Sequence, residues 1–163
     1  MRKLLLAALL ALALPATALA KNFSIGDATP FASVTVPDNW DPEEVDNGVT
    51  ANSPDGTYVS LEAVALGDLE KSITENLKYL AGEGVSINDS SLEKGDGEIG
   101  GIKFVFRKWT GTDKDGPTLV TLAIAVLDEE RTVVMTTWSA PETDKSDGPA
   151  LEAIAGSIKP VKK

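Results

Sequence analysis

The sequence predicts an α+β domain in which two helices pack on a largely antiparallel sheet of about six to seven strands. Most of the strand-like segments follow one another through short turns, which favours antiparallel pairing. Two segments, far apart in the chain, have the 3.6-residue apolar spacing of an amphipathic helix. No repeat, low-complexity tract or linker interrupts residues 21–163, so the sequence predicts a single domain there.

The first 20 residues have the three parts of a secretory signal peptide. Arg2 and Lys3 precede an unbroken apolar run at 4–14, and Ala18 and Ala20 supply the small residues that a signal peptidase needs. The apolar run is shorter than the roughly 20 residues that a spanning helix requires. We therefore expect cleavage after Ala20, a periplasmic or secreted protein, and no membrane insertion after cleavage.

The first half of the domain predicts three strands and one helix, after a loosely held start at 21–29. Residues 31–36 alternate as a strand does and are stopped by Pro37. The turn Ser53-Pro54-Asp55-Gly56 joins two further strands into a hairpin, because Pro fixes φ and Gly accepts a positive φ. Those two strands are expected at 49–52 and 57–65. The helix is expected at 68–81, with an apolar stripe of Leu69, Ile73, Leu77 and Leu80.

The second half predicts a three-stranded meander followed by a helix. The meander strands are expected at 102–110, 118–127 and 131–139. Residues 119–127 are apolar on both faces except at Thr121, and they predict the most buried strand. Before the meander, a weak strand is expected at 85–92 and a mobile loop or bulge at the glycine-rich residues 95–101. The last helix is expected at 149–159, with Pro149 at its first position.

The composition excludes several classes of chemistry. The chain contains neither His nor Cys, which rules out ligation of metals by His or Cys, thiol nucleophiles and His general bases. Its formal charge is −10, and loss of the two basic residues of the signal segment makes it −12. The electrostatic field of so negative a protein repels phosphate backbones, so nucleic acid is not an expected partner. We expect no cofactor and no enzymatic activity.

Two carboxylate patterns bear on metal binding and on hydrolysis. The turn Asp113-Lys114-Asp115-Gly116 has part of a calcium-loop spacing, but Gly111 and Leu122 stand where acidic ligands are required. It predicts a solvated hairpin turn, and no metal site is expected. The adjacent acids Glu43/Glu44 and Glu129/Glu130 leave a carboxylate-based hydrolase open, which requires two acids that converge in a cleft.

The candidate binding residues are Lys103, Arg107 and Trp109, in the strand predicted at 102–110. Residues two apart in a strand project to the same side, so these three share one face. A basic, aromatic face is unusual in so acidic a chain, and Trp and Arg are enriched in binding hot spots. It predicts a docking patch for an acidic partner. The alternative is that Trp109 packs under a helix while Lys103 and Arg107 pair with acids.

Several short motifs at turns and at the ends of predicted elements together resemble those of the PsbP-like group, which includes the DcrB-like periplasmic proteins. These motifs are Val36-Pro37 with Trp40 shortly after, the Ser53–Gly56 turn, Gly100-Gly101-Ile102-x-Phe104, and residues 154–160. The resemblance covers residues 31–159. It implies an α/β/α sandwich around a twisted antiparallel sheet, and a non-enzymatic role in binding or assembly. Metal roles of His residues in photosynthetic members do not transfer, because this chain has no His.

Three functions therefore stay open. The first is an exported, non-catalytic binding or assembly factor with an envelope protein as its partner. The second is a small-molecule carrier with a pocket between sheet and helices, and the third is the carboxylate-based hydrolase. The surroundings of the tryptophans separate the first two, since a deep apolar cavity favours a ligand and an exposed flat patch favours a protein partner. Trp138 is expected in the core, and Trp40 is expected to be partly exposed.

Overall fold

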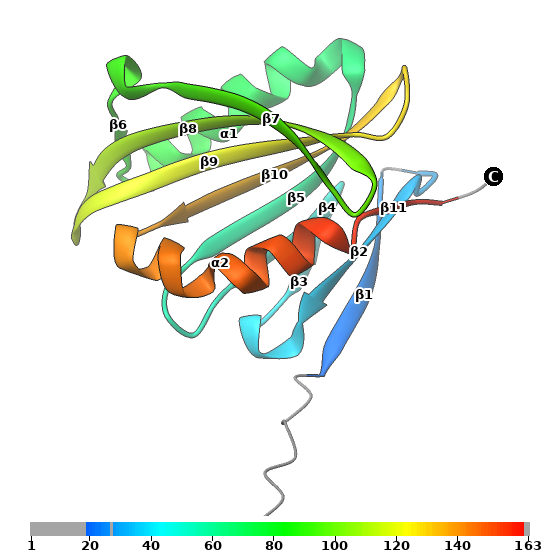
Figure 1. Cartoon of the computed structure of the whole chain (residues 1–163), viewed down its shortest axis with the longest axis horizontal. Helices are drawn as coiled ribbons and strands as arrows, with labels where there is room; N and C mark the ends of the chain where they lie inside the picture. Colours follow the sequence, from blue (N-terminus) through cyan, green and yellow to red (C-terminus); the bar gives the residue numbers. More distant parts are fainter. Residues whose placement is uncertain (1–18, 27, 162–163) are drawn as a thin grey trace, which may run out of the picture.

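A computed structural model describes residues 19–26 and 28–161 of the protein. These residues form an eight-stranded sheet, a second sheet of three strands and two α-helices (Figure 1). The predicted α+β class is confirmed, although the strands are more numerous than the six to seven expected. Of the predicted signal segment, only Leu19 and Ala20 lie within the described residues. None of the helices in the described part of the chain is long and apolar enough to cross a membrane.

The main sheet is antiparallel at each pairing among the described residues. Seven of its strands follow the spatial order β3-β4-β5-β10-β9-β8-β6, and β7 also pairs with β8. Their bounds are β3 Glu43–Val45, β4 Gly48–Asn52, β5 Tyr58–Ala65, β6 Ser86–Ile87, β7 Glu93–Ile99, β8 Ile102–Asp113, β9 Gly116–Val126 and β10 Arg131–Ser139.

The second sheet has the order β1-β2-β11, with bounds Ala20–Ile25, Ala32–Pro37 and Lys159–Pro160. The expectation of a loosely held start at 21–29 is therefore wrong for residues 21–25. Phe23 and Ile25 alternate with polar residues, and both side chains are buried in the core. This alternation anchors β1 to β2.

The two helices cover opposite faces of the main sheet (Figure 1). Helix α1 (Leu69–Gly82) packs on the face that carries Val120, Leu122 and Ile124 of β9. Helix α2 (Pro141–Gly156) and the second sheet cover the opposite face, where Ala123 and Ala125 of β9 lie. Strand β9 is thus buried on both sides, as its apolar pattern predicts. Three short 3-10 helices, Asp38–Trp40, Leu66–Asp68 and Asp89–Ser91, complete the connections.

The region before β8 differs from the sequence-based expectation. Residues 93–99 form strand β7 and not a loop, and the strand expected at 85–92 shrinks to β6. Gly95 and Gly97 pair across the ladder with Phe106 and Phe104 of β8. The turn at Gly100-Gly101 uses φ angles of 60° and 84°, which glycine adopts without strain. The neighbouring strand, more than the local sequence, therefore makes this segment extended.

Helix α2 begins eight residues earlier than predicted, at Pro141 in place of Pro149. Pro141 occupies the first helical position, and Glu142 and Asp144 lie in the first turn, where the helix dipole favours acids. The first half of the helix is polar and hides its periodicity. Asp147, in this half, accepts a buried hydrogen bond of 2.6 Å from the Ser53 hydroxyl, which joins α2 to the turn after β4.

Candidate ligand-binding cleft

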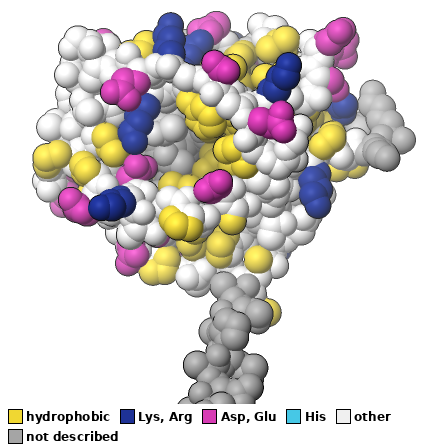
Figure 2. All heavy atoms as spheres, in the orientation of Figure 1, with side chains coloured by type: hydrophobic (Ala, Val, Ile, Leu, Met, Phe, Trp, Pro, Cys, Tyr) yellow, Lys and Arg dark blue, Asp and Glu magenta, His cyan; other side chains and the backbone are white. Residues whose placement is uncertain are grey.

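A cleft of about 450 Å³ opens between α2 and the face of the main sheet that α2 covers. Figure 2 shows apolar side chains within a hollow on this face of the molecule. Strands β7 to β10 form its floor and one wall, and α2 forms the other wall. The lining residues are Glu93, Lys94, Gly95, Ile99, Phe106, Lys108, Thr121, Ala123, Met135, Thr137, Asp144, Leu151, Glu152 and Ala155.

Small residues leave this space unfilled. Ala123 of β9 and Ala155 of α2 line it from the sheet and from the helix. At the edge of the cleft, a Cβ atom on Gly95 would meet nothing within 4 Å. Gly95 is the ladder partner of Phe106, but the Phe106 ring leans toward Gly97, where a Cβ atom would lie 3.5 Å from it, so the space beside Gly95 stays open. The volume lies within the roughly 300–1,000 Å³ typical of small-molecule sites.

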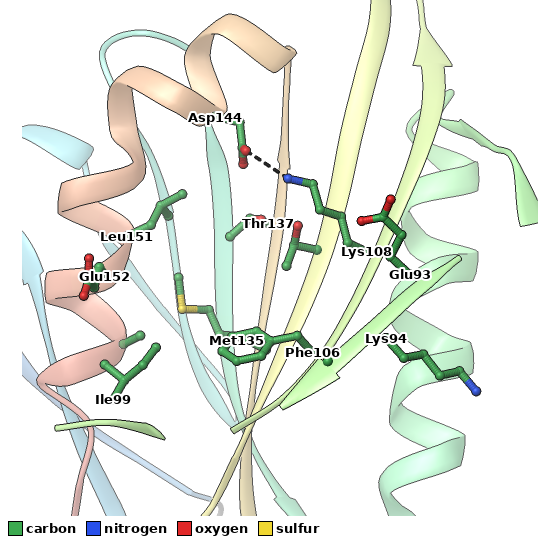
Figure 3. A pocket seen from close by; sticks show the side chains of 14 residues that line it. Glu93, Lys94, Ile99, Phe106, Lys108, Met135, Thr137, Asp144, Leu151 and Glu152 are labelled. Carbon is green, nitrogen blue, oxygen red and sulfur yellow. Dashed lines mark hydrogen bonds and ion pairs between the residues drawn. The ribbon is translucent and has the colours of Figure 1, made fainter. Parts of the chain in front are cut away.

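One end of the cleft is mainly apolar, with the Glu152 side chain on its α2 side (Figure 3). Ile99, Phe106, Met135 and Leu151 converge there from β7, β8, β10 and α2 (Figure 3). The Phe106 ring is held by a stacked contact with the buried Phe104, with ring centroids 5.8 Å apart and planes inclined by 13°. A rigid aromatic wall facing Met135 and Leu151 suits an aliphatic or aromatic group, and burying such a group there would be favourable.

The other end of the cleft is polar. The Lys108 ammonium lies 3.3 Å from the Asp144 carboxylate, which links β8 to the first turn of α2. Figure 3 shows the Thr137 side chain between this ion pair and Met135. Glu93 is the cross-strand neighbour of Lys108, whereas the Lys94 side chain points away from the cleft (Figure 3). The cleft therefore runs from an apolar end to an end that can hydrogen-bond.

The arrangement gives little support to hydrolysis. Three acids line the cleft, but the Asp144 carboxylate is paired with Lys108, and Glu93 and Glu152 lie on opposite walls (Figure 3). The acid pairs expected as candidates, Glu43/Glu44 and Glu129/Glu130, lie outside this cleft. Among residues 19–26 and 28–161, no group of three or more acidic side chains is placed to hold a metal ion.

The predicted patch is brought together on one strand, but its members have different surroundings. Lys103 is exposed and lies opposite Glu98 of β7. The Arg107 guanidinium donates a hydrogen bond of 2.7 Å to Glu70 in the first turn of α1. This hydrogen bond and the charge of Arg107 lower the pKa of the Glu70 carboxyl.

Trp109 is only 5% exposed and packs under α1 with Val120 and Leu122. The expectation that it would serve as an exposed anchor therefore needs correction. Side chains alternate between the two faces of β8, so Trp109 lies on the same face as Arg107. It is nearer the centre of the face that α1 covers. The exposed apolar residue of this face is instead Val105, at 41%. Docking of a partner over Lys103 and Arg107 stays a prediction.

The burial of the other two tryptophans differs from the expectation. Trp40, expected to be partly exposed, is 3% exposed and belongs to the core on the face of the main sheet that α2 and the second sheet cover. Trp138 is half-buried against the α1 core cluster, and its indole N–H donates to Asp113, 2.9 Å away. Neither lines the cleft under α2.

The Asp113 side chain closes the β8–β9 turn. Burial raises the pKa of the Asp113 carboxyl, but the hydrogen bonds that it accepts from Trp138 and from the backbone N–H groups of Asp115 and Gly116 outweigh burial and lower it. The turn 113–116 is thus a hairpin turn in which this carboxylate organises the backbone, as its residue types predict.

The cleft itself was not predictable from residue types in one segment, because its lining comes from four strands and a helix. One local signal exists, the two glycines at alternate positions of a strand opposite two phenylalanines. Glycine in a strand often marks a place where something else approaches closely.

The structure defines a class of protein. It is an α+β domain with helices on opposite faces of an antiparallel sheet and a cleft under the second helix. No family model matches the sequence, and no curated protein is similar to it. Solved structures do share its fold. Cyanobacterial PsbP from Synechocystis superposes with a TM-score of 0.56 at 10% identity, over 88% of this chain and 94% of that protein. The chain thus has the PsbP-like fold.

Two further structures extend the comparison. LpqN of Mycobacterium tuberculosis, described as involved in cell envelope biogenesis, gives a TM-score of 0.54 at 13% identity, over 88% of this chain and 92% of LpqN. A protein from Bacteroides thetaiotaomicron gives 0.58 at 15% identity over 88% of this chain. The present chain spans about half of the length of that protein, at 49%. At these identities the likeness concerns the fold.

Proposed function

We propose that this protein is an exported, non-catalytic binding protein that holds the apolar part of a small molecule in the cleft between α2 and the main sheet. The observation that carries the proposal is the open apolar cleft, in which Phe106, Met135 and Leu151 face unfilled space. Exposing apolar side chains in a hollow of this size to water costs free energy, and such hollows usually mark binding sites. Its polar end can orient a bound molecule, but it lacks a nucleophile paired with a base.

Export is supported by two independent points. The signal-peptide pattern of residues 1–20 predicts a mature start at Lys21 and one exported domain of residues 21–163. LpqN, which shares the fold, is described with a role in the cell envelope. A periplasmic or secreted location follows from the proposal.

The test is to close the cleft without touching the core. In Gly95→Trp, the indole would enter the open space of the cleft that Gly95 lines. We expect its affinity for N-phenyl-1-naphthylamine, an uncharged probe that fluoresces in apolar sites, to fall by about tenfold or more, which corresponds to about 1.4 kcal/mol. The matched control is Asp96→Trp, which adds the same ring to the opposite face of β7 and should bind the probe as the native protein does. Equal binding by the two variants would reject the cleft as the site.

A second candidate function is docking of an envelope protein on the outer face of β8. The observation that favours it is the exposed Val105 between Lys103 and Arg107, which offers an apolar contact flanked by cations. A Lys103→Glu/Arg107→Glu variant should lose a partner that depends on this face. A Lys71→Glu/Lys78→Glu variant, with the same charge change on α1, should retain it. Retention by both variants would reject the face.

A further inference from the structure

The polar end of the cleft contains the Lys108–Asp144 ion pair and one further acid, Glu93. Lys108 and Asp144 are partly open to solvent, with 40% and 23% of their side chains exposed, and their charges lie 3.3 Å apart. A negatively charged group entering beside Lys108 would meet the Asp144 carboxylate, and Glu93 lies across the ladder from Lys108. A positively charged group entering beside Asp144 would meet the Lys108 ammonium. Either ion would have to break the pair or be desolvated beside a like charge, and both cost free energy.

An uncharged head group meets no such penalty. The Lys108 ammonium has hydrogen-bond donors to spare, and the Asp144 carboxylate has spare acceptor sites. Thr137, which lies between this pair and the apolar end, adds a hydroxyl that can do both (Figure 3). A hydroxyl or amide group both donates and accepts, so it can bond to both members of the pair without separating them.

The apolar end determines the rest of the ligand. Met135, Phe106, Ile99 and Leu151 surround it, and Met and Leu side chains adapt to flexible aliphatic chains. The path from this end to the ion pair is continuous, because all of these residues line one cleft. A molecule with an aliphatic chain at one end and a hydrogen-bonding head at the other matches both ends at once.

We propose that the cleft selects uncharged amphiphiles, with an aliphatic chain against Phe106 and Met135 and a hydroxyl- or amide-bearing head on the Lys108–Asp144 pair. This inference rests on the proposed function of the cleft and adds the class of ligand. The ion pair acts as the selectivity element, since a charged head group of either sign would meet a like charge within it.

The experiment compares three amphiphiles with the same ten-carbon chain, each below its micelle concentration. These are decyl glucoside, decanoate and decyltrimethylammonium, and each is titrated against N-phenyl-1-naphthylamine bound to the folded protein. We expect the uncharged glucoside to compete about tenfold better than either ion, the size of effect that a hydrogen bond to a charged group gives.

Two variants then move the selectivity in opposite directions. Asp144→Asn leaves Lys108 without its acidic partner and should improve competition by decanoate several-fold. Lys108→Met leaves Asp144 without its basic partner and should improve competition by decyltrimethylammonium. The control Glu75→Gln removes a carboxylate from the exposed Lys71–Glu75 pair on α1, away from the cleft, and should leave the order of the three ligands unchanged.

The outcomes separate the two proposals. If the native protein binds decanoate or decyltrimethylammonium as tightly as the glucoside, or if neither variant shifts the order, the selectivity inference is wrong and the cleft remains a binding site. If the probe binds no less to Gly95→Trp than to Asp96→Trp, the site itself is wrong and the inference fails with it.

Discussion

Arg107 and Trp109 lie two residues apart on β8 and face the same side, yet they contribute to the fold differently. Trp109 is buried under α1, and Trp109→Ala should destabilise the protein by about 3–5 kcal/mol through loss of packing and a cavity. Arg107 pairs with Glu70 at the surface, so Arg107→Ala should cost about 1 kcal/mol or less. Denaturant unfolding of both variants measures the difference. Similar losses would mean that the two side chains have been assigned the wrong surroundings.

The same ion pair gives a pH dependence with a defined sign. The pKa of Glu70 is lowered in the folded protein by its hydrogen bond from Arg107, so the folded state binds this proton less readily than the unfolded chain. The pair therefore stabilises the fold above the ordinary glutamate pKa, and that stabilisation is lost as the pH falls through the lowered value.

In Arg107→Met the Glu70 pKa should return toward its usual range. Carboxyl NMR titration of Glu70 in the two proteins gives the comparison. The difference in unfolding free energy between native protein and variant should shrink as the solution is acidified. A difference that grows at low pH would contradict the assigned pair.

Burial raises the pKa of the Tyr58 phenol to about 12, with a further increase from the neighbouring Tyr79. Their ring centroids are 6.1 Å apart. The folded state holds the Tyr58 proton more tightly than the unfolded chain does, so its contribution to stability is complete below pH 10 and is lost as the pH rises through 12. Spectrophotometric titration should show the Tyr58 phenol ionising late. In Tyr79→Phe the late ionisation should move to lower pH.

At the scale of elements, α1 has a deeply buried row and a shallower one. Leu80 is fully buried, whereas Leu77 is half-buried at the edge of the same cluster. Leu80→Ala should destabilise the protein by about 2–5 kcal/mol, and Leu77→Ala by less, because its site can be filled by solvent. Thermal or denaturant unfolding gives the order, and a larger loss for Leu77 would mean that the helix is rotated relative to this description.

The elements that the sequence predicted correctly are those whose own pattern agrees with their surroundings. Helix α1 has its apolar stripe, and β9 and β10 have uninterrupted apolar or β-branched runs bounded by turns. Strand β7 was missed because its residues are glycine and charged, and its extended form comes from pairing with β8. The start of α2 was missed because the stripe of that helix begins only in its second half, after Pro149.

At the scale of the whole molecule, sequence alone placed helices on an antiparallel sheet, but it could not assemble the cleft. A small-molecule pocket between sheet and helices was one of the open functions, yet its lining residues were unknown, since Gly95, Phe106, Lys108, Met135 and Asp144 come from separate elements. The patch at Lys103, Arg107 and Trp109 was correctly aligned on one strand. The sequence could not show that α1 would cover Trp109 and pair with Arg107.

Signal cleavage after Ala20 is compatible with the folded domain. It would remove one residue of β1 and keep Phe23 and Ile25, which fill the core. The native protein should therefore have the mass of residues 21–163. A shorter form starting at Thr29 should be strongly destabilised, because it lacks both buried side chains. Intact-mass measurement and unfolding of the shortened chain check these two statements.

The small sheet also determines how the domain responds to being pulled. Strands β1 and β11 both run antiparallel to the β2 strand between them, with Ala20 opposite Pro37 at one end and Pro160 opposite Ala32 at the other. Because hydrogen bonds in such ladders lie across the strands, tension between residues 20 and 161 loads both ladders in shear. The β1–β2 ladder has six residue pairs and the β2–β11 ladder has two, so the β11 end should yield first. A domain stretched between two attachments would thus open first at β11, and the force would then act on α2, the helix that precedes β11 and forms one wall of the cleft.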